Sequence, residues 1–158
     1  MKHSFQVRHL DPQIGQQLFT LSEEALRAKH AVKMIASTKP GFPCRISLQD
    51  AEVGEEVILF PYEHHATNSP YRASGAVFIR KQATSPQIGP NELPDMLLHR
   101  QLSVRAYDQS GMMKKTKVLS GTALQIAIEA LFSDQSIHYL QIHNAGPGCF
   151  NCQIDRVG

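Results

Sequence analysis

The chain has 158 residues, of which 42% are apolar and 19% charged, and its formal net charge is +2. A chain of this size can bury roughly two-thirds of its unfolded surface, so we expect a single domain over 1–158 without disulfide staples. Three cysteines, an odd number, indicate reduced thiols. No apolar stretch approaches the about 20 residues of a membrane span, and the first residues lack the apolar run of a secretory signal, so we expect a cytoplasmic protein.

The first half of the sequence predicts short strands and one helix. Strands are expected at 5–10, 31–36, 56–62 and 75–81, and the third is apolar on both faces. A helix over 22–27 begins with Ser22 as its N-cap. Prolines make 39–43 irregular, and polar residues predict a loop over 63–74.

The second half predicts two hairpins and a stronger helix. Leu102, Val104 and Ala106 alternate with Ser103, Arg105 and Tyr107, which predicts a strand that turns at 108–111 into 113–119. Thr122 and Gln125 predict a capping box for a helix over 122–132, whose apolar stripe should pack on the sheet. Strands at 137–143 and 150–157 close the chain. The fold class is therefore α+β, a mostly antiparallel sheet with two helices, with barrel-like closure left open.

The segment 143–150 concentrates polar chemistry. It places the imidazole of His143, the amide of Asn144 and the thiol of Cys149 around a turn containing Gly146 and Gly148. Glycine and proline turns can present several backbone donors at one point. The segment 43–45, which contains Cys44 and Arg45, adds a second thiol and a guanidinium, so the two stretches together predict a polar site.

Three stretches in chain order resemble a known family. They read PGFPCR over 40–45, SPYRASG over 69–75 and GPGCF over 146–150. By these stretches the chain is similar to the bacterial domain-of-unknown-function family 1203, from about residue 40 to residue 156. The resemblance implies a small stand-alone bacterial protein and supplies no activity. It adds weight to five site residues, which are Cys44, Arg45, Tyr71, Arg72 and Cys149.

The cysteines allow a metal site as one interpretation. Cys149 and Cys152 have a spacing found in zinc sites, and His143 and Cys44 could complete the ligand set. Residues three apart on a strand point to opposite faces, however, so Cys152 should lie in the core with Phe150. We therefore expect no metal and no cofactor.

The arginines favour an anion site instead. Guanidinium groups bind carboxylate and phosphate oxygens in a bidentate manner, so Arg45, Arg72 and Arg105 would form such a site if they converge. The alternative is that each pairs with a surface acid or a carbonyl. His64 and His65 are interpreted as solvated loop residues.

Two function classes follow. The first is a binding or interaction module, with an anion-favouring site where the loops of Cys44, Tyr71 and Cys149 meet. Its ligand-binding residues are Arg45, Tyr71, Arg72, Arg105, Asn144, Gly146 and Gly148. The alternative is an enzyme in which Cys149 or Cys44 is the nucleophile and His143 the base, acting on a small anionic substrate.

The charge of the chain bears on its partners. Lys114, Lys115 and Lys117 form its one lysine cluster, and we interpret them as the protected edge of a sheet in preference to a nucleic-acid patch. A homodimer is left open, and no membrane partner is expected.

Overall fold

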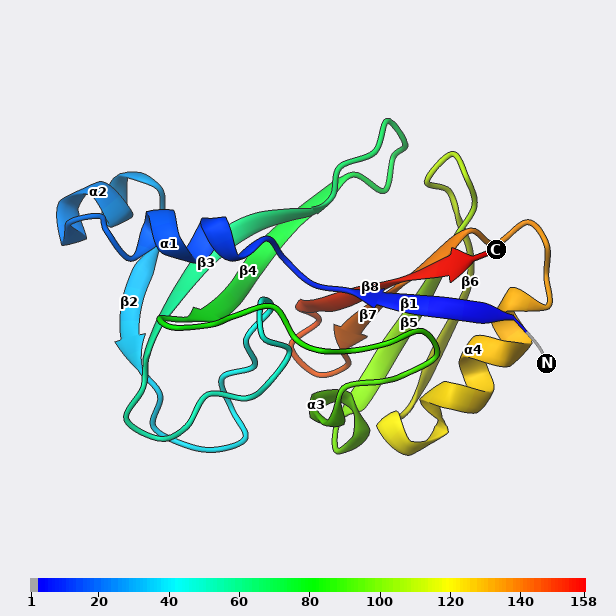
Figure 1. The fold of residues 1–158 in the computed structure, drawn as a ribbon. Coiled ribbons are helices and arrows are strands. Elements are labelled where there is room, and N and C mark those ends of the chain that lie inside the picture. The colour runs from blue at the N-terminus through cyan, green and yellow to red at the C-terminus, as the bar shows by residue number, and fades with distance from the viewer. Residues whose placement is uncertain (1–2) are drawn as a thin grey trace. The chain divides into compact units, whose positions relative to one another are not determined.

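A computed structural model describes residues 3–158 and divides the chain between two compact units (Figure 1). Unit 1 takes in the described residues up to Arg8, together with Glu63–Ala73 and Ile88–Gly158. Unit 2 takes in His9–Tyr62 and Ser74–Gln87. The expectation of a single domain stays a prediction.

Unit 1 is built on a five-stranded antiparallel sheet in the order β1-β8-β7-β5-β6. Its strands are β1 (Ser4–Arg8), β5 (Gln101–Tyr107), β6 (Met113–Ser120), β7 (Tyr139–Asn144) and β8 (Phe150–Val157). Both predicted hairpins are therefore confirmed. The sheet is open, with β1 and β6 at its edges, so it does not close into a barrel.

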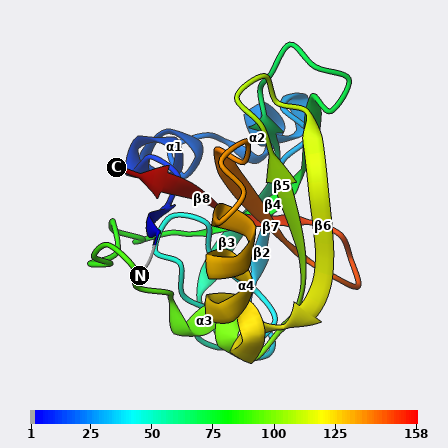
Figure 2. The ribbon, with the colours of Figure 1, turned by 90° about the vertical axis from the view of Figure 1, so that its right-hand side faces the viewer.

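One face of this sheet is apolar and carries the core of unit 1. The alternation predicted for β5 buries Leu102, Val104 and Ala106 completely, and Cys152 is 1% exposed on β8, which confirms its place in the core. The helix α4 (Leu124–Phe132) runs beside β6 (Figure 2), and the Arg156 guanidinium of β8 lies 4.7 Å from the centre of its Phe132 ring. The apolar stripe predicted for this helix is buried.

The predicted capping box of this helix is wrong. A 3-10 turn, η1 (Gly121–Ala123), precedes α4, and no side chain caps either element. The Thr122 hydroxyl instead bonds that of Ser120 at 3.1 Å. The Gly121 N–H still pairs with the Arg100 carbonyl at 2.8 Å, so the strand pairing continues up to the turn.

Unit 2 contains two helices and most of a three-stranded sheet in the order β2-β3-β4. Its elements are α1 (Pro12–Leu18), α2 (Glu23–Ala28), β2 (Val32–Ile35), β3 (Glu56–His65) and β4 (Ala73–Arg80). Ser22 caps α2 as predicted, because its hydroxyl accepts a hydrogen bond from the Ala25 N–H at 3.1 Å. Ala36, Ala51 and Val57 form a buried cluster in this unit.

The α+β class with mostly antiparallel sheets is confirmed, and several boundaries are corrected. Two short helices were not expected, α1 and α3 (Asp95–Leu98). The strand β3 continues through His65, although 63–74 was predicted to be a loop. Within the described residues, no helix has the length and apolar character that a membrane crossing requires.

Candidate polar site on the sheet of unit 1

The face of the five-stranded sheet opposite the core is polar. Side chains alternate along a strand, so the residues that lie between the buried ones project to this second face. We call it the polar face; its members on β5, β7 and β8 are Ser103, Arg105, Tyr107, Tyr139, Gln141, His143, Gln153 and Asp155. The strand register sets Arg105 opposite Gln141 and Ser103 opposite His143.

The segment containing His64 and His65 is bonded to this face. The His64 Nδ1–H donates to the Gln141 Oε1 at 2.8 Å, and the Gln141 amide donates back to the His64 carbonyl at 2.7 Å. His65 contacts Tyr139, two residues earlier on β7. The interpretation of both histidines as solvated loop residues is therefore wrong, because His65 is only 3% exposed and both belong to β3.

The rings of His64, His143 and Phe150 pack together. The His64 ring stacks on Phe150 with ring centres 5.1 Å apart, and its centre lies 5.0 Å from that of His143. Burial lowers the pKa of both histidines, and the nearby positive charge of Arg105 lowers them further. The pKa of His143 falls to about 4, so this ring is neutral at neutral pH.

His143 has one satisfied and one unsatisfied ring nitrogen. Its Nδ1–H donates to the Gly148 carbonyl at 3.0 Å, which fixes the tautomer and leaves a lone pair on Nε2. This Nε2 is buried without a hydrogen-bond partner among the described residues. Because buried polar atoms normally find partners, the lone pair marks His143 as an unusual member of the polar face.

His65 and Tyr139 form a second polar pair. The His65 Nδ1–H donates to the Tyr71 carbonyl at 2.8 Å, so its Nε2 accepts a hydrogen bond from the Tyr139 hydroxyl at 2.6 Å. Burial raises the pKa of Tyr139 to about 12, which keeps the phenol protonated and able to donate. Tyr107 stacks on Tyr139 with ring centres 5.3 Å apart and closes this side of the polar face.

Arg105 is the cation at the centre of the polar face. Its guanidinium hydrogen-bonds Tyr107 and adds positive charge near His64 and His143. No described carboxylate forms an ion pair with it. Arg8 and Arg72, by contrast, pair with Asp155 at 2.8 Å and Glu63 at 2.9 Å. Among these arginines of unit 1, Arg105 therefore has charge that no acid neutralises.

The turn after β7 holds three of the predicted site residues. The Asn144 amide donates to the Cys149 Sγ at 3.3 Å, and the Asn144 carbonyl accepts the Gly148 N–H at 2.8 Å. Gly148 has a φ of 79°, which favours glycine. Gly146 is exposed on the turn. Cys149 is half-buried, and its sulfur accepts a hydrogen bond from the Asn144 amide. The hydrogen bond of the His143 ring goes to the Gly148 carbonyl and not to this sulfur.

Tyr71 and Arg72 occupy the segment between β3 and β4. Arg72 pairs with Glu63 and donates to the Thr67 carbonyl at 3.3 Å, which is the alternative that the sequence left open for each arginine. Tyr71 is 38% exposed, and its ring centre lies 6.2 Å from that of Tyr107.

Cys44 and Arg45 belong to unit 2 and are both buried there. The Cys44 sulfur accepts hydrogen bonds from the Ser47 N–H at 3.4 Å and the Arg80 N–H at 3.3 Å. Arg45 donates to the Pro43 carbonyl at 2.5 Å. Their convergence with the Tyr71 and Cys149 loops stays a prediction.

The sequence interpretation missed most of the polar face. His64, His65, Tyr139 and Gln141 were not among the predicted site residues. The signal was the alternation of Tyr139, Gln141 and His143 on β7, which repeats that of Ser103, Arg105 and Tyr107 on β5. Two adjacent strands that place polar side chains on the same face predict that this face of the sheet is polar.

A metal centre finds no support in this layer. Over residues 3–158, no three His, Cys, Asp or Glu side chains are grouped so that they could hold an ion. The polar face offers one guanidinium, neutral imidazoles and phenols, which are groups that donate or accept hydrogen bonds.

Comparison with known proteins adds the family. No curated protein and no solved structure gives a significant match to the chain. A family model described as "Protein of unknown function (DUF1203)" matches residues 41–156, which include every residue assigned above to the polar face. The chain belongs to this family of unknown function.

Proposed function

We propose that the chain is a binding protein whose polar face holds a small anion at Arg105. The observation that carries the proposal is the arginine charge without a carboxylate partner, in contrast to the paired Arg8 and Arg72. A partly buried guanidinium without a counter-ion is costly, and a bound carboxylate, phosphate or sulfate would offset that cost through bidentate hydrogen bonds.

The neighbours of Arg105 support an anion over a cation. A cation site requires carboxylates, and no acid of the described residues is paired with Arg105. His64 and His143 have lowered pKa values and are neutral at neutral pH, so Arg105 is the charged group at this place. The Tyr107 hydroxyl already bonds Arg105.

The alternative, a cysteine enzyme, has weaker support. A nucleophilic thiolate needs a base or a cation within hydrogen-bond reach. The hydrogen bond of the Cys149 sulfur comes from Asn144, and the Nδ1–H of His143 is used by Gly148. Cys44 is completely buried and accepts two backbone N–H groups, an arrangement typical of a structural cysteine.

The thermal midpoint in added anion tests the proposal. Phosphate, sulfate and acetate are added up to about 50 mM at ionic strength held constant with chloride. A ligand that binds only the folded state stabilises it by about 1.4 kcal/mol at ten times its Kd, which raises the midpoint by a few degrees. At least one of the three anions is expected to do so.

Variants of one residue identify the site. R105L should abolish the increment while the protein stays folded, and R105K should keep part of it because the charge remains. R8L, which removes a paired arginine elsewhere in unit 1, is the matched control and should keep the whole increment. No increment in the native protein with any of the three anions, or an equal one in R105L, would contradict the proposal.

A further inference from the structure

The two edges of the sheet in unit 1 differ in how they are covered. The outer edge of β1 is bonded by the chain itself, because the Asn91 N–H donates to the Phe5 carbonyl at 2.9 Å and the Asn91 side chain accepts the Phe5 N–H at 2.9 Å. Gln6 adds a bond to the Ile88 carbonyl at 3.1 Å. The other edge, β6, receives no such bonds from the described residues.

The pairing of β6 with β5 shows which of its backbone groups are unpaired. Gly121 and Arg100 are directly opposite and hydrogen-bonded, and hydrogen-bonded pairs recur at every second residue of an antiparallel ladder. Lys117 and Leu119 therefore direct their N–H and C=O groups to β5. The residues that alternate with them direct these groups outward; they are Thr116, Val118 and Ser120, in the part of the strand before the register shift at Lys114.

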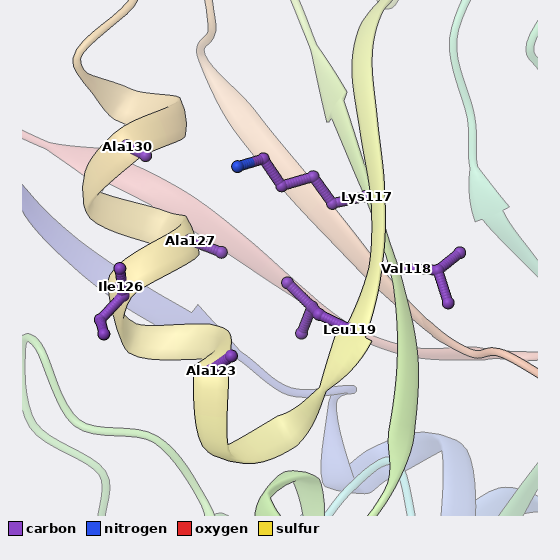
Figure 3. Close-up of a pocket in the computed structure, with 7 residues that line it drawn as sticks. All are labelled: Lys117, Val118, Leu119, Ala123, Ile126, Ala127 and Ala130. Atoms are coloured by element: carbon purple, nitrogen blue, oxygen red, sulfur yellow. The ribbon is translucent and has the colours of Figure 1, made fainter.

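An apolar groove runs along this edge on the α4 side (Figure 3). It has a volume of about 440 Å³. Its lining residues are Lys117, Val118, Leu119, Ala123, Ile126, Ala127 and Ala130. Figure 3 shows the Lys117 side chain reaching from β6 toward α4 across the groove. Ile126, which is 76% exposed, offers an apolar surface beside three small alanines.

The charge of the edge is positive. Lys115 is paired with Asp134 at 3.2 Å, whereas Lys114 and Lys117 form no ion pair with a described acid. The strand contains three lysines and no acidic residue. Lysines on a sheet edge commonly prevent pairing with another strand. Lysine charges repel a basic strand and disfavour an apolar one, because the charges lose water. An acidic strand would instead be attracted by the same charges.

We propose that β6 binds an extended acidic segment of another protein by strand addition. The segment would use the outward groups of Thr116, Val118 and Ser120 for backbone hydrogen bonds. Alternate side chains of the segment would project into the groove beside Ile126, where apolar residues fit. Its acidic residues would lie on the face opposite the groove, and the positive charge of Lys114 and Lys117 would attract them. A second copy of this chain fits less well, because pairing β6 with β6 sets lysines against lysines.

The probe is an end-blocked peptide of about nine residues in which valine alternates with glutamate, long enough to span a strand of this length. Its affinity is measured by calorimetry at neutral pH, and the backbone amides of the chain are followed by NMR. The amides of Thr116, Val118 and Ser120 should shift and gain protection from hydrogen exchange. A peptide with lysine in place of glutamate should bind at least about tenfold more weakly.

Two variants test the contacts independently. V118P removes one outward N–H without breaking a β5–β6 bond, since proline is tolerated at such edge positions, and it should weaken binding about tenfold or more. V118T keeps the N–H and is the matched control. The pair K114E and K117E, in one chain, leaves the backbone intact and should weaken binding to a similar extent.

Several results would overturn the inference. These are unchanged β6 amides at about 1 mM peptide, equal affinity for the lysine peptide, or binding that neither V118P nor the charge-reversed chain weakens. Concentration-dependent dimerisation with protection of the β6 amides, in the absence of peptide, would assign the edge to a second copy of this chain instead.

Discussion

His143 illustrates how the polar face shapes the ionisation of a single residue. Its ring is 1% exposed, bonded at Nδ1 and unbonded at Nε2, and it lies near the charge of Arg105. Burial is the largest cause of its lowered pKa, and the backbone bond to Gly148 opposes that shift only in part. The ring therefore resists protonation until the solution is strongly acidic.

This lowered pKa predicts a loss of stability in acid. A histidine has a pKa of 6.5 in the unfolded chain and about 4 in the folded one, so between these values the unfolded state binds more protons. The free energy of unfolding should therefore fall as the pH drops through this window, by roughly 3 kcal/mol for this residue, and stay level above it.

Urea unfolding at about pH 7.5 and about pH 4.5 measures the effect. H143Q keeps a donor for Gly148 but cannot be protonated, so its loss of stability between the two pH values should be smaller by one to three kcal/mol, on the order of the shift itself. His64 and other groups continue to titrate in the variant. An equal loss in both proteins would show that His143 is not protected as described.

At the scale of elements, the segment between β3 and β4 is fixed to the β5–β6 turn. The Ser69 hydroxyl donates to the Gly111 carbonyl at 2.7 Å, and a Cβ on Gly111 would lie 2.1 Å from the Thr67 Oγ1. Gly111 also has a φ of 79°. These contacts hold the turn against the segment that carries His64 and His65, so glycine is required there for two reasons.

G111A should therefore destabilise the protein by about 1–3 kcal/mol, because it adds both a clash and backbone strain. Thermal and urea unfolding give the value. Adding T67A should recover part of the loss, since the clash is then removed while the strain remains. G146A is the matched control, because a Cβ there meets nothing within 4 Å, and it should change the stability little. A G111A protein as stable as G146A would refute this close contact.

The elements that the sequence predicted are those with unbroken local patterns. The alternation in β5 and the helical spacing of Leu124, Ala127 and Ile128 need no knowledge of distant contacts. The helix α1 was missed although Asp11 and Pro12 are a regular helix start, because Gly15 interrupts its pattern. The end of β3 was missed because the polar residues after Tyr62 predicted a loop, whereas the strand continues to His65.

The site could be predicted from the sequence less completely than the fold. The turn of Gly148 and Cys149 and the shared face of Ser103, Arg105 and Tyr107 on β5 followed from local sequence. The contacts of His64 with Gln141 and of His65 with Tyr139 join residues 77 and 74 positions apart, and no local pattern reports such pairs. Arg72 was assigned to a ligand but pairs with Glu63, nine positions earlier.

At the scale of the whole molecule, the reactivity of the three cysteines measures how well the core of each unit excludes solvent. Cys44 of unit 2 and Cys152 of unit 1 are buried, whereas Cys149 is half-buried at the end of the turn. Buried structural thiols are inert toward reagents. The native chain should therefore react quickly at one thiol, and at all three after unfolding.

Labelling with a thiol reagent followed by peptide mass analysis identifies the reacting cysteine. The label should be found on Cys149, and C149S should remove the fast phase. Rapid modification of Cys44 or Cys152 in the native protein would show that the core of the corresponding unit is open to solvent on the timescale of the reaction.

The pKa of His64 with and without anion tests the Arg105 site most directly. Arg105 contributes to the lowered pKa of this ring, so an anion bound to the guanidinium should raise that pKa. NMR titration measures it, with H64Q used to identify the resonance. Titrations with and without phosphate, at constant ionic strength, should give a higher pKa with phosphate in the native protein and no change in R105L. An unchanged pKa in the native protein, or an equal rise in R105L, would contradict the anion site.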